Sequence, residues 1–213
     1  MIGPMTSGLQ ALERLREGNR RFASGDPSHD SRSDRARRDA LTSGQQPFAA
    51  ILGCSDSRVP VEIVFDQGLG DLFVIRVAGN VVAPSQIGSV EFAAERFGTR
   101  LVVVLGHSRC GAIQATLEQL QRPRENQSRN LHSIVDRIRP SVEGLLATEL
   151  RHEADALVRQ AVRANIRASV GHLRYGSPLI ERLVQQSGLL VVGAEYSLET
   201  GLVDFFDGAP QAA

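Results

Sequence analysis

The sequence predicts an α/β fold, in which helices flank a central, mostly parallel β-sheet. Short apolar runs rich in valine, isoleucine and leucine recur along the chain, and stretches of helical periodicity separate them. Buried parallel strands have this continuous apolar character because helices cover both faces of such a sheet. The alternation of the two signals favours about four parallel strands, with a possible fifth strand at an edge.

An amphipathic helix followed by a polar arm is expected at the N-terminus. The apolar stripe of this helix consists of Leu9, Leu12, Leu15 and Phe22. These residues recur near helical spacing, and the helix should end near Gly25. Residues 26–46 are polar, with acids matching bases, and read as a loop with at most one short helix. We therefore expect 1–46 to form an N-terminal helix and arm.

The α/β core is expected to cover residues 47–213. Its strands should lie at 48–53, 72–77, 101–105 and 189–193, with a weaker edge strand at 202–206. Helical segments should lie at 60–65, 84–97, 112–120, 131–139, 142–150, 154–170 and 178–186, with a loop at 123–127. Pro140 should stop one helix because proline has no amide hydrogen. Without an internal repeat or a linker, the chain of 213 residues is expected to form one domain.

The balance of charges in the sequence limits the kinds of molecule that the protein is expected to bind. Lysine plus arginine equals aspartate plus glutamate, at 24 each, so neither nucleic acid nor an anionic membrane is an expected partner. The first residues lack a secretory signal pattern, and no apolar run approaches the roughly 18 residues of a membrane span. Two cysteines in such a chain are more consistent with reduced thiols than with a disulfide. These features predict a cytoplasmic enzyme or binding protein.

Both cysteines lie in short polar motifs that follow apolar runs. Cys-Ser-Asp-Ser-Arg occupies 54–58, and His-Ser-Arg-Cys-Gly occupies 107–111. Open parallel sheets keep their ligand sites just past the carboxyl ends of the strands. Cys54, His107 and Cys110 should therefore meet at one edge of the sheet.

Two thiols and one imidazole match the ligand set of a catalytic zinc ion, which keeps three protein ligands and one open position. Cys54 would join the His107 and Cys110 pair from a neighbouring strand. A zinc finger would need two ligand pairs close in sequence, and this chain has one. The alternative is that both cysteines are inert core thiols beside a helix-capping histidine.

The acidic and basic residues of the first motif suggest a second part of the site. Asp56 follows a candidate ligand by two residues and can reach a metal or a water bound to it. Arg58 can bind that carboxylate with two hydrogen bonds and hold it off the metal. The alternative is a local turn stabilised by the aspartate, with a solvated arginine.

The paired motifs closely resemble those of the β-class carbonic anhydrases, and the resemblance runs from the first helix to about Val203. It includes the segments 58–60, 68–71, 73–76 and 89–92. It implies that Cys54, His107 and Cys110 bind one Zn²⁺ per chain and that Asp56 and Arg58 form a catalytic dyad. It also implies that Gln45 hydrogen-bonds the substrate and that Phe73 lines the carbon dioxide pocket.

Two positions depart from the family pattern. Phe92 stands where many plant-type members carry a pocket tyrosine, so one hydroxyl of the family site is missing. Ile51 stands where members with an allosteric bicarbonate site carry tryptophan, although their arginine is matched by Arg76. This argues against that form of regulation. Apart from this match, Arg76 and Tyr196 are expected to be core or interface residues.

The resemblance implies reversible hydration of carbon dioxide to bicarbonate and a proton, by attack of a zinc-bound hydroxide. Asp56 would orient that hydroxide, while Gln45 and backbone amides near Gly111 would bind bicarbonate oxygens. Two thiolates offset the charge of the metal, so activity should favour alkaline pH. The family also has a closed form, in which Asp56 would become the fourth zinc ligand.

Family members assemble as dimers, often as dimers of dimers, and line each active site with both subunits. We expect the first helix and the arm to contact the partner subunit, because their apolar stripe needs a surface to cover it. Alternative functions are hydrolysis of carbonyl sulfide or carbon disulfide at the same zinc site, and non-catalytic sensing of bicarbonate. A thiol redox function is disfavoured because the chain has no Cys-x-x-Cys pair.

Overall fold

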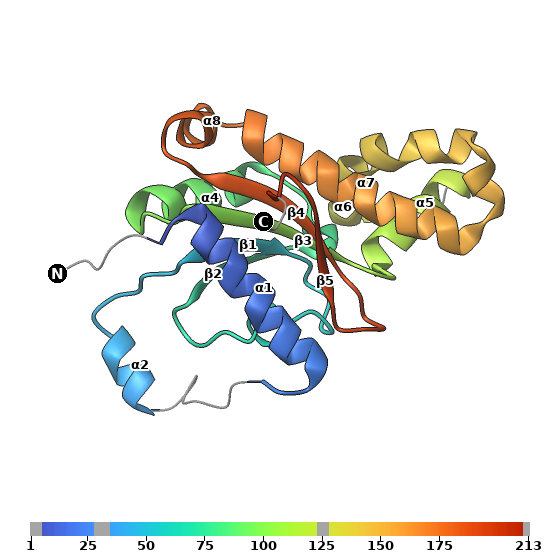
Figure 1. Ribbon diagram of the computed structural model, residues 1–213. Helices are drawn as coiled ribbons and strands as arrows, with labels where there is room; N and C mark the ends of the chain where they lie inside the picture. The colour runs from blue at the N-terminus through green and yellow to red at the C-terminus, as the bar shows by residue number, and fades with distance from the viewer. Residues whose placement is uncertain (1–5, 28–34, 123–127, 211–213) are drawn as a thin grey trace.

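The central element is a five-stranded sheet in the order β2-β1-β3-β4-β5 (Figure 1). The computed structural model describes residues 6–27, 35–122 and 128–210. The strands are β1 (Ala49–Gly53), β2 (Leu72–Arg76), β3 (Leu101–His107), β4 (Leu190–Tyr196) and β5 (Val203–Asp207). β1 to β4 are parallel, and β5 pairs antiparallel with β4 at the edge. The predicted α/β fold is confirmed, including its edge strand.

Helices precede, connect and follow the strands. The α-helices are α1 (Gly8–Ser24), α2 (Arg35–Leu41), α3 (Val61–Val64), α4 (Pro84–Arg96), α5 (Gly111–Gln121), α6 (Arg129–Val142), α7 (Ala154–Tyr175) and α8 (Pro178–Gln186). Shorter 3-10 helices lie at Ala78–Asn80, Glu143–Ala147 and Glu149–His152. The expected loop at 123–127 and part of the polar arm, 28–34, lie outside the described residues.

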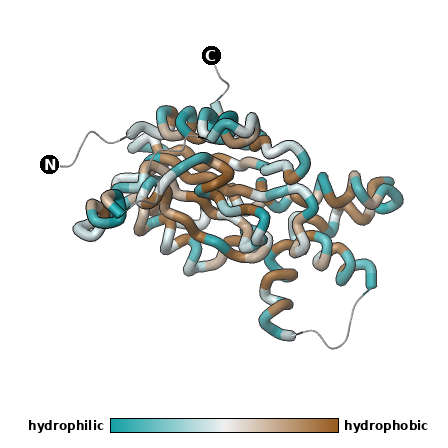
Figure 2. The backbone as a smooth tube through the Cα atoms, turned by 90° about the horizontal axis from the view of Figure 1, so that it is seen from below, coloured by the Kyte–Doolittle hydropathy of each residue, from teal (hydrophilic) through white to brown (hydrophobic). Residues whose placement is uncertain are grey.

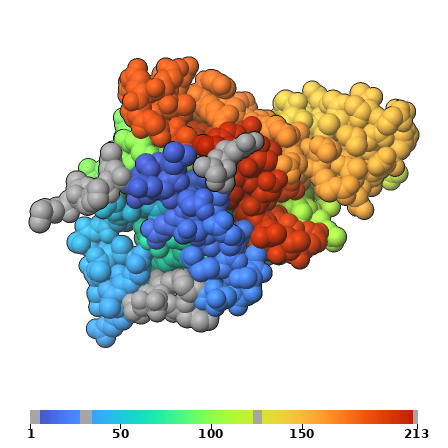
Figure 3. All heavy atoms as spheres, in the orientation of Figure 1, coloured from blue at the N-terminus to red at the C-terminus, as the bar shows by residue number. Residues whose placement is uncertain are grey.

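The sheet has a separate apolar core on each face. Along β3, Val102 and Val104 join the core that α4 to α8 cover, whereas Leu101, Val103 and Leu105 join the core under α1 and α3. This alternation follows from the two-residue period of a strand. Figure 2 shows the apolar segments concentrated in the centre, and Figure 3 shows α6 and its neighbours projecting to one side.

Most of the apolar stripe of α1 packs against the chain's own sheet. Leu12 and Leu15 are buried, whereas Leu9 is 59% exposed. The helix begins with a capping box formed by Ser7 and Gln10, and Gly25 ends it with a left-handed φ of 75°. The expectation that this stripe needs a partner subunit is therefore wrong for its central residues, because the stripe already has a cover.

The helix near Pro140 differs from the prediction. Instead of stopping there, α6 continues to Val142. The proline lacks the amide that would donate to the carbonyl of Asp136, but Ile138 and Val142 are buried in the core and hold the segment in the helix, where Ser141 Oγ donates to Ile138 O at 2.7 Å. The next segment is 3-10 rather than α-helical. Among the described residues, no helix has the length and apolar character that crossing a membrane requires.

Candidate metal centre

The carboxyl ends of β1 and β3 form the point at which the sheet changes direction. β1 lies between β2 and β3, so the chain continues to one side after β1 and to the other side after β3. Gly53 pairs with Leu105, which places Cys54 beside the end of β3. His107 is the last residue of β3 itself, two residues beyond the predicted end of that strand. Such switch points are where open α/β sheets bind ligands.

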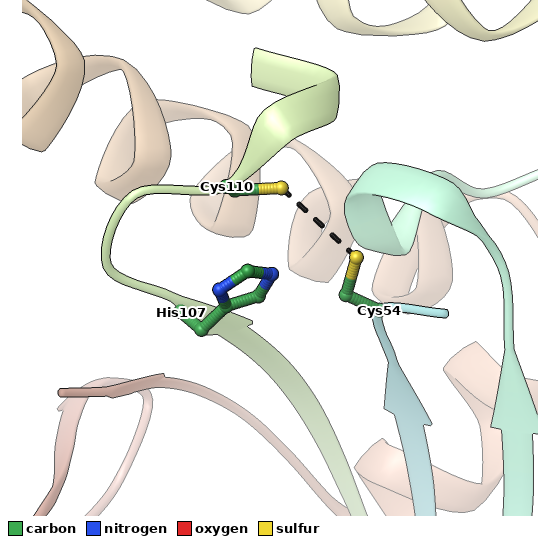
Figure 4. A group of neighbouring side chains, drawn as sticks. All are labelled: Cys54, His107 and Cys110. Carbon is green, nitrogen blue, oxygen red and sulfur yellow. Dashed lines mark hydrogen bonds between the residues drawn. The ribbon is translucent and has the colours of Figure 1, made fainter. Parts of the chain in front are cut away.

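Three buried side chains meet at this point, as the sequence predicts. One donor atom from each of Cys54, His107 and Cys110 lies within 4.8 Å of the others. The two sulfur atoms are 4.0 Å apart, and Figure 4 shows them facing the same space as one ring nitrogen of His107. Cys54 follows β1, and Cys110 caps the N-terminus of α5.

A contact with the backbone carbonyl of the next residue, Ser108, orients the imidazole of His107 toward the two sulfurs. His107 Nδ1 lies 3.0 Å from the carbonyl oxygen of Ser108. A carbonyl can only accept, so Nδ1 carries the hydrogen and Nε2 of the neutral ring has a free lone pair. Nε2 is buried and has no hydrogen-bond partner in the described part of the chain. An unpartnered buried acceptor beside two thiols is the arrangement that a metal ion would satisfy.

The geometry of the cluster fits zinc. Two sulfurs that are each 2.3 Å from one tetrahedral ion lie about 3.8 Å apart, close to the 4.0 Å between Cys54 Sγ and Cys110 Sγ. The donor set of two sulfurs and one nitrogen also suits zinc and leaves one coordination position open.

The pKa values of the two thiols are shifted in opposite directions. The hydrogen bond from the Cys110 thiol lowers the pKa of Cys54 to about 4, with further help from the backbone amides of Asp56 and Gly79. The same hydrogen bond, together with burial, raises the pKa of Cys110. The metal-free pair thus shares one proton. Because zinc binds thiolates, loading this site must release that proton.

Asp56 and Arg58 lie against the cluster as a pair. Arg58 Nε donates to Asp56 Oδ1 at 2.9 Å, and its Nη2 donates to Oδ2 at 2.8 Å. This contact holds the pKa of Asp56 well below its usual range. Asp56 Oδ2 is 3.8 Å from His107 Nε2, so an ionised carboxylate borders the space between the donor atoms. Both carboxylate oxygens of Asp56 are therefore bound to Arg58.

Arg76 supports the loop that carries these residues, a role that its sequence position does not reveal. Its Nε donates to the carbonyl oxygen of Cys54 at 2.9 Å, and its Nη2 donates to that of Asp56 at 2.6 Å. Arg76 ends β2, the neighbour of β1, and therefore reaches the loop directly. Tyr196, by contrast, is buried in the core, as the sequence predicts.

A second support comes from the buried face of α7. Asn165 Nδ2 donates to the carbonyl oxygen of Gly79 at 2.8 Å, and Ser169 Oγ donates to that of Asn80 at 3.0 Å. The amide of Gly79 in turn donates to Cys54 Sγ at 3.4 Å. The signal available in the sequence is a pair of polar residues, four positions apart, within the apolar stripe of the predicted 154–170 helix.

Most of the chain is similar to known carbonic anhydrases. A family model described as "Carbonic anhydrase" matches residues 49–203. The structure resembles the β-carbonic anhydrase CafA of the fungal pathogen Aspergillus fumigatus, with a TM-score of 0.72, 26% identity and coverage of 94% of this chain and 91% of that one. The chain belongs to the β-class carbonic anhydrase family.

Curated bacterial members of the family are more similar in sequence. Carbonic anhydrase 2 of Mycobacterium tuberculosis is 38% identical over 198 residues, which are 93% of this chain and 92% of that protein. The carbonic anhydrase of Mycolicibacterium smegmatis is 38% identical over 201 residues, 94% of each chain. The similarity to these relatives thus extends beyond residues 49–203, which the family model matches.

Two of the residues that the family resemblance assigns to substrate lie away from the metal cluster within this carbonic anhydrase chain. Gln45 precedes β1 and Cys54 follows it, so the strand, about 17 Å long, lies between them along the chain. Phe73 pairs with Ala50 near the start of β1. It packs against Phe92, whose ring centroid is 6.1 Å away and whose side chain is largely exposed.

Gly111 is the assigned residue that does lie beside the cluster. It is the first residue of α5 and directly follows Cys110. The amides of Ile113 and Ala112, in the same helical turn, act to lower the pKa of the Cys110 thiol. The start of α5 therefore faces the sulfur of Cys110 as well as the edge of the sheet.

Proposed function

We propose that the protein catalyses the reversible hydration of carbon dioxide to bicarbonate and a proton, with one zinc ion held by Cys54, His107 and Cys110. The observation that carries this proposal is that three buried donor atoms converge and that a carboxylate lies beside them. Asp56 Oδ2 is 3.8 Å from His107 Nε2. Bound at such a site, zinc lowers the pKa of water toward neutrality and so supplies a nucleophile for carbon dioxide.

The side chains around the cluster would orient the reacting groups. Asp56 accepts a hydrogen bond from the attacking water and turns its lone pair toward carbon. Arg58 holds the carboxylate in place with two hydrogen bonds and a third from its backbone amide at 3.0 Å. The start of α5, at Gly111, would offer backbone amides to a bicarbonate oxygen.

Stopped-flow hydration of carbon dioxide against pH, with zinc measured on the same sample, tests the proposal. We expect one zinc per chain and a rate that rises toward alkaline pH. Two thiolates offset the charge of the ion, so a water there loses its proton at higher pH than beside three imidazoles. One zinc per chain without hydration at any pH would refute the activity but leave the ligand set intact, and carbonyl sulfide would be the next substrate to try.

The separation of Gln45 and Phe73 from the cluster supports a site shared between two copies of the chain. Both residues lie toward the amino ends of the strands, and the metal cluster lies at the carboxyl ends. We therefore propose a homodimer, or a dimer of dimers, in which one copy supplies these residues to the centre of the other. The exposed Phe92, at 53%, and Ile63, at 59%, are apolar surface that such contacts would cover.

Mixing two inactive variants tests the shared site. Gln45→Ala and Asp56→Asn subunits, unfolded and refolded together, should recover activity that neither has alone. In a mixed dimer, the Gln45→Ala chain keeps its own Asp56 and receives Gln45 from its partner. Random pairing then restores about a quarter of wild-type activity. No recovery despite a measured mixed dimer would show that Gln45 acts within its own chain or not at all.

A further inference from the structure

The two residues between His107 and Cys110 form a turn that needs outside support. Arg109 adopts a left-handed conformation, with a φ of 54°, which residues other than glycine rarely take. Ser108 and Arg109 are also the residues that set the direction of the chain between the second and third zinc ligands. What holds this turn therefore affects both ligands.

Both carbonyl groups of the turn are used by the metal centre. The carbonyl of Ser108 accepts the hydrogen bond from His107 Nδ1, at 3.0 Å, and so selects the ring form whose Nε2 faces the sulfurs. The carbonyl of Arg109 accepts a hydrogen bond from Arg58 Nη2 at 3.3 Å. One turn thus positions a zinc ligand and one member of the catalytic pair.

Glu199, in the connection between β4 and β5, binds both side chains of the turn. Its Oε2 accepts a hydrogen bond from Ser108 Oγ at 2.9 Å, and its Oε1 lies 2.9 Å from Arg109 Nε. Ser108 Oγ also accepts from the amide of Leu198 at 3.0 Å. The Ser108 hydroxyl therefore donates to Glu199 and accepts from the amide of Leu198, and these two bonds fix its orientation.

The connection that carries Glu199 is itself anchored in the fold. The buried Asn19 of α1 donates to the carbonyl of Gly201 at 2.9 Å and accepts from the amide of Val203 at 2.8 Å. The same side chain donates to the carbonyl of Val64 at 3.1 Å. α1 and α3 thus support the segment from which Glu199 reaches the turn.

We propose that Glu199 is a positioning residue of the metal centre, which fixes the orientation of His107 and the anchor of Arg58 through the Ser108-Arg109 turn. The inference rests on the proposed zinc ligands but not on the reaction. Its hydrogen bond to Ser108 carries the effect. The ion pair contributes little, because Arg109 is 71% and Glu199 49% exposed, and exposed pairs are weak.

Zinc affinity, measured by competition with a chromophoric chelator, tests the proposal. Glu199→Ala and Ser108→Ala should each weaken zinc binding about 10-fold or more, the usual cost of removing a residue that orients a ligand. The double variant should lose no more than the weaker-binding single variant, because Glu199 acts through the Ser108 hydroxyl. Glu199→Gln keeps an acceptor for that hydroxyl and should stay within about threefold of wild type.

Asp204→Asn is the matched control. Asp204 is an exposed carboxylate on the adjoining strand, paired with Arg163 at 2.8 Å, and no described contact joins it to the turn. This variant should bind zinc as wild type does. If Glu199→Ala and Ser108→Ala bind zinc as tightly as Asp204→Asn, the proposal is wrong.

The ring form of His107 gives a readout that needs neither zinc nor activity. Nitrogen NMR of the metal-free protein should show the form with hydrogen on Nδ1 in wild type and in Asp204→Asn. A mixture of both forms is expected in Glu199→Ala, and its dispersed spectrum would show that the variant is folded. A single Nδ1–H form in folded Glu199→Ala would contradict the positioning role. A wild type that binds zinc without hydrating carbon dioxide would refute the activity alone.

Discussion

Replacing Cys110 by serine is expected to remove zinc from the protein. Cys110 supplies one of the three donor atoms within 4.8 Å of one another, and a serine hydroxyl stays protonated where a thiolate is needed. The loss of affinity should exceed the roughly 10- to 100-fold cost of losing a residue that only supports a ligand. Zinc per chain, measured by atomic emission after dialysis against a weak chelator, should fall from one to near zero.

The control for Cys110→Ser must separate loss of the ligand from loss of the fold. Ser57→Ala changes an exposed residue in the motif of the first cysteine and should keep one zinc per chain. Zinc-depleted wild type, followed by circular dichroism, shows what the metal contributes to stability. A Cys110→Ser protein that keeps one tightly held zinc would remove Cys110 from the ligand set.

The metal centre could be predicted from sequence because its parts sit next to strong local signals. Cys54 and His107 each follow or end an apolar run, and parallel strands bring their carboxyl ends to one edge. The predicted ligand set also requires that the strands before Cys54 and His107 be neighbours. The adjacency of β1 and β3 agrees with it, since only neighbouring ends bring these side chains within reach.

The supports of the centre could not be predicted in the same way. Ser108 and Glu199 are 91 positions apart, and Asn165 and Gly79 are 86 apart. Such contacts depend on how the strands and helices finally pack, and no local periodicity records them. Sequence showed at most that Asn165 is polar within an apolar stripe.

The error at Pro140 has a different origin. The rule that proline ends a helix holds for helix interiors, where a hydrogen bond is lost and the ring meets the preceding turn. Pro140 loses its hydrogen bond to the carbonyl of Asp136, but the packing of Ile138 and Val142 in the core keeps the segment helical. Tertiary contacts thus overrode a local propensity.

Asp56→Asn is expected to keep zinc and lose most of the activity. The ligand atoms are unchanged, so one zinc per chain should remain. Arg58 donates two side-chain hydrogen bonds, at 2.9 and 2.8 Å, to the two carboxylate oxygens of Asp56. Asparagine has only one oxygen to accept them, and its neutral amide is a poorer acceptor for the attacking water. By comparison with other residues that accept or donate a proton in the transition state, the hydration rate should fall about 10²- to 10⁴-fold.

The pH dependence of this loss distinguishes its cause. Arg58 holds the pKa of Asp56 in the folded protein well below the value of about 4 in an unfolded chain. Asp56 is therefore fully ionised above about pH 4, and its contribution to activity is lost only as the pH falls through the lower pKa of the folded protein. The deficit of Asp56→Asn should therefore persist across the neutral and alkaline range. Full activity in this variant would show that the pair is not catalytic. Loss of zinc together with activity would instead show that Asp56 ligates the metal, as in the closed form of the family.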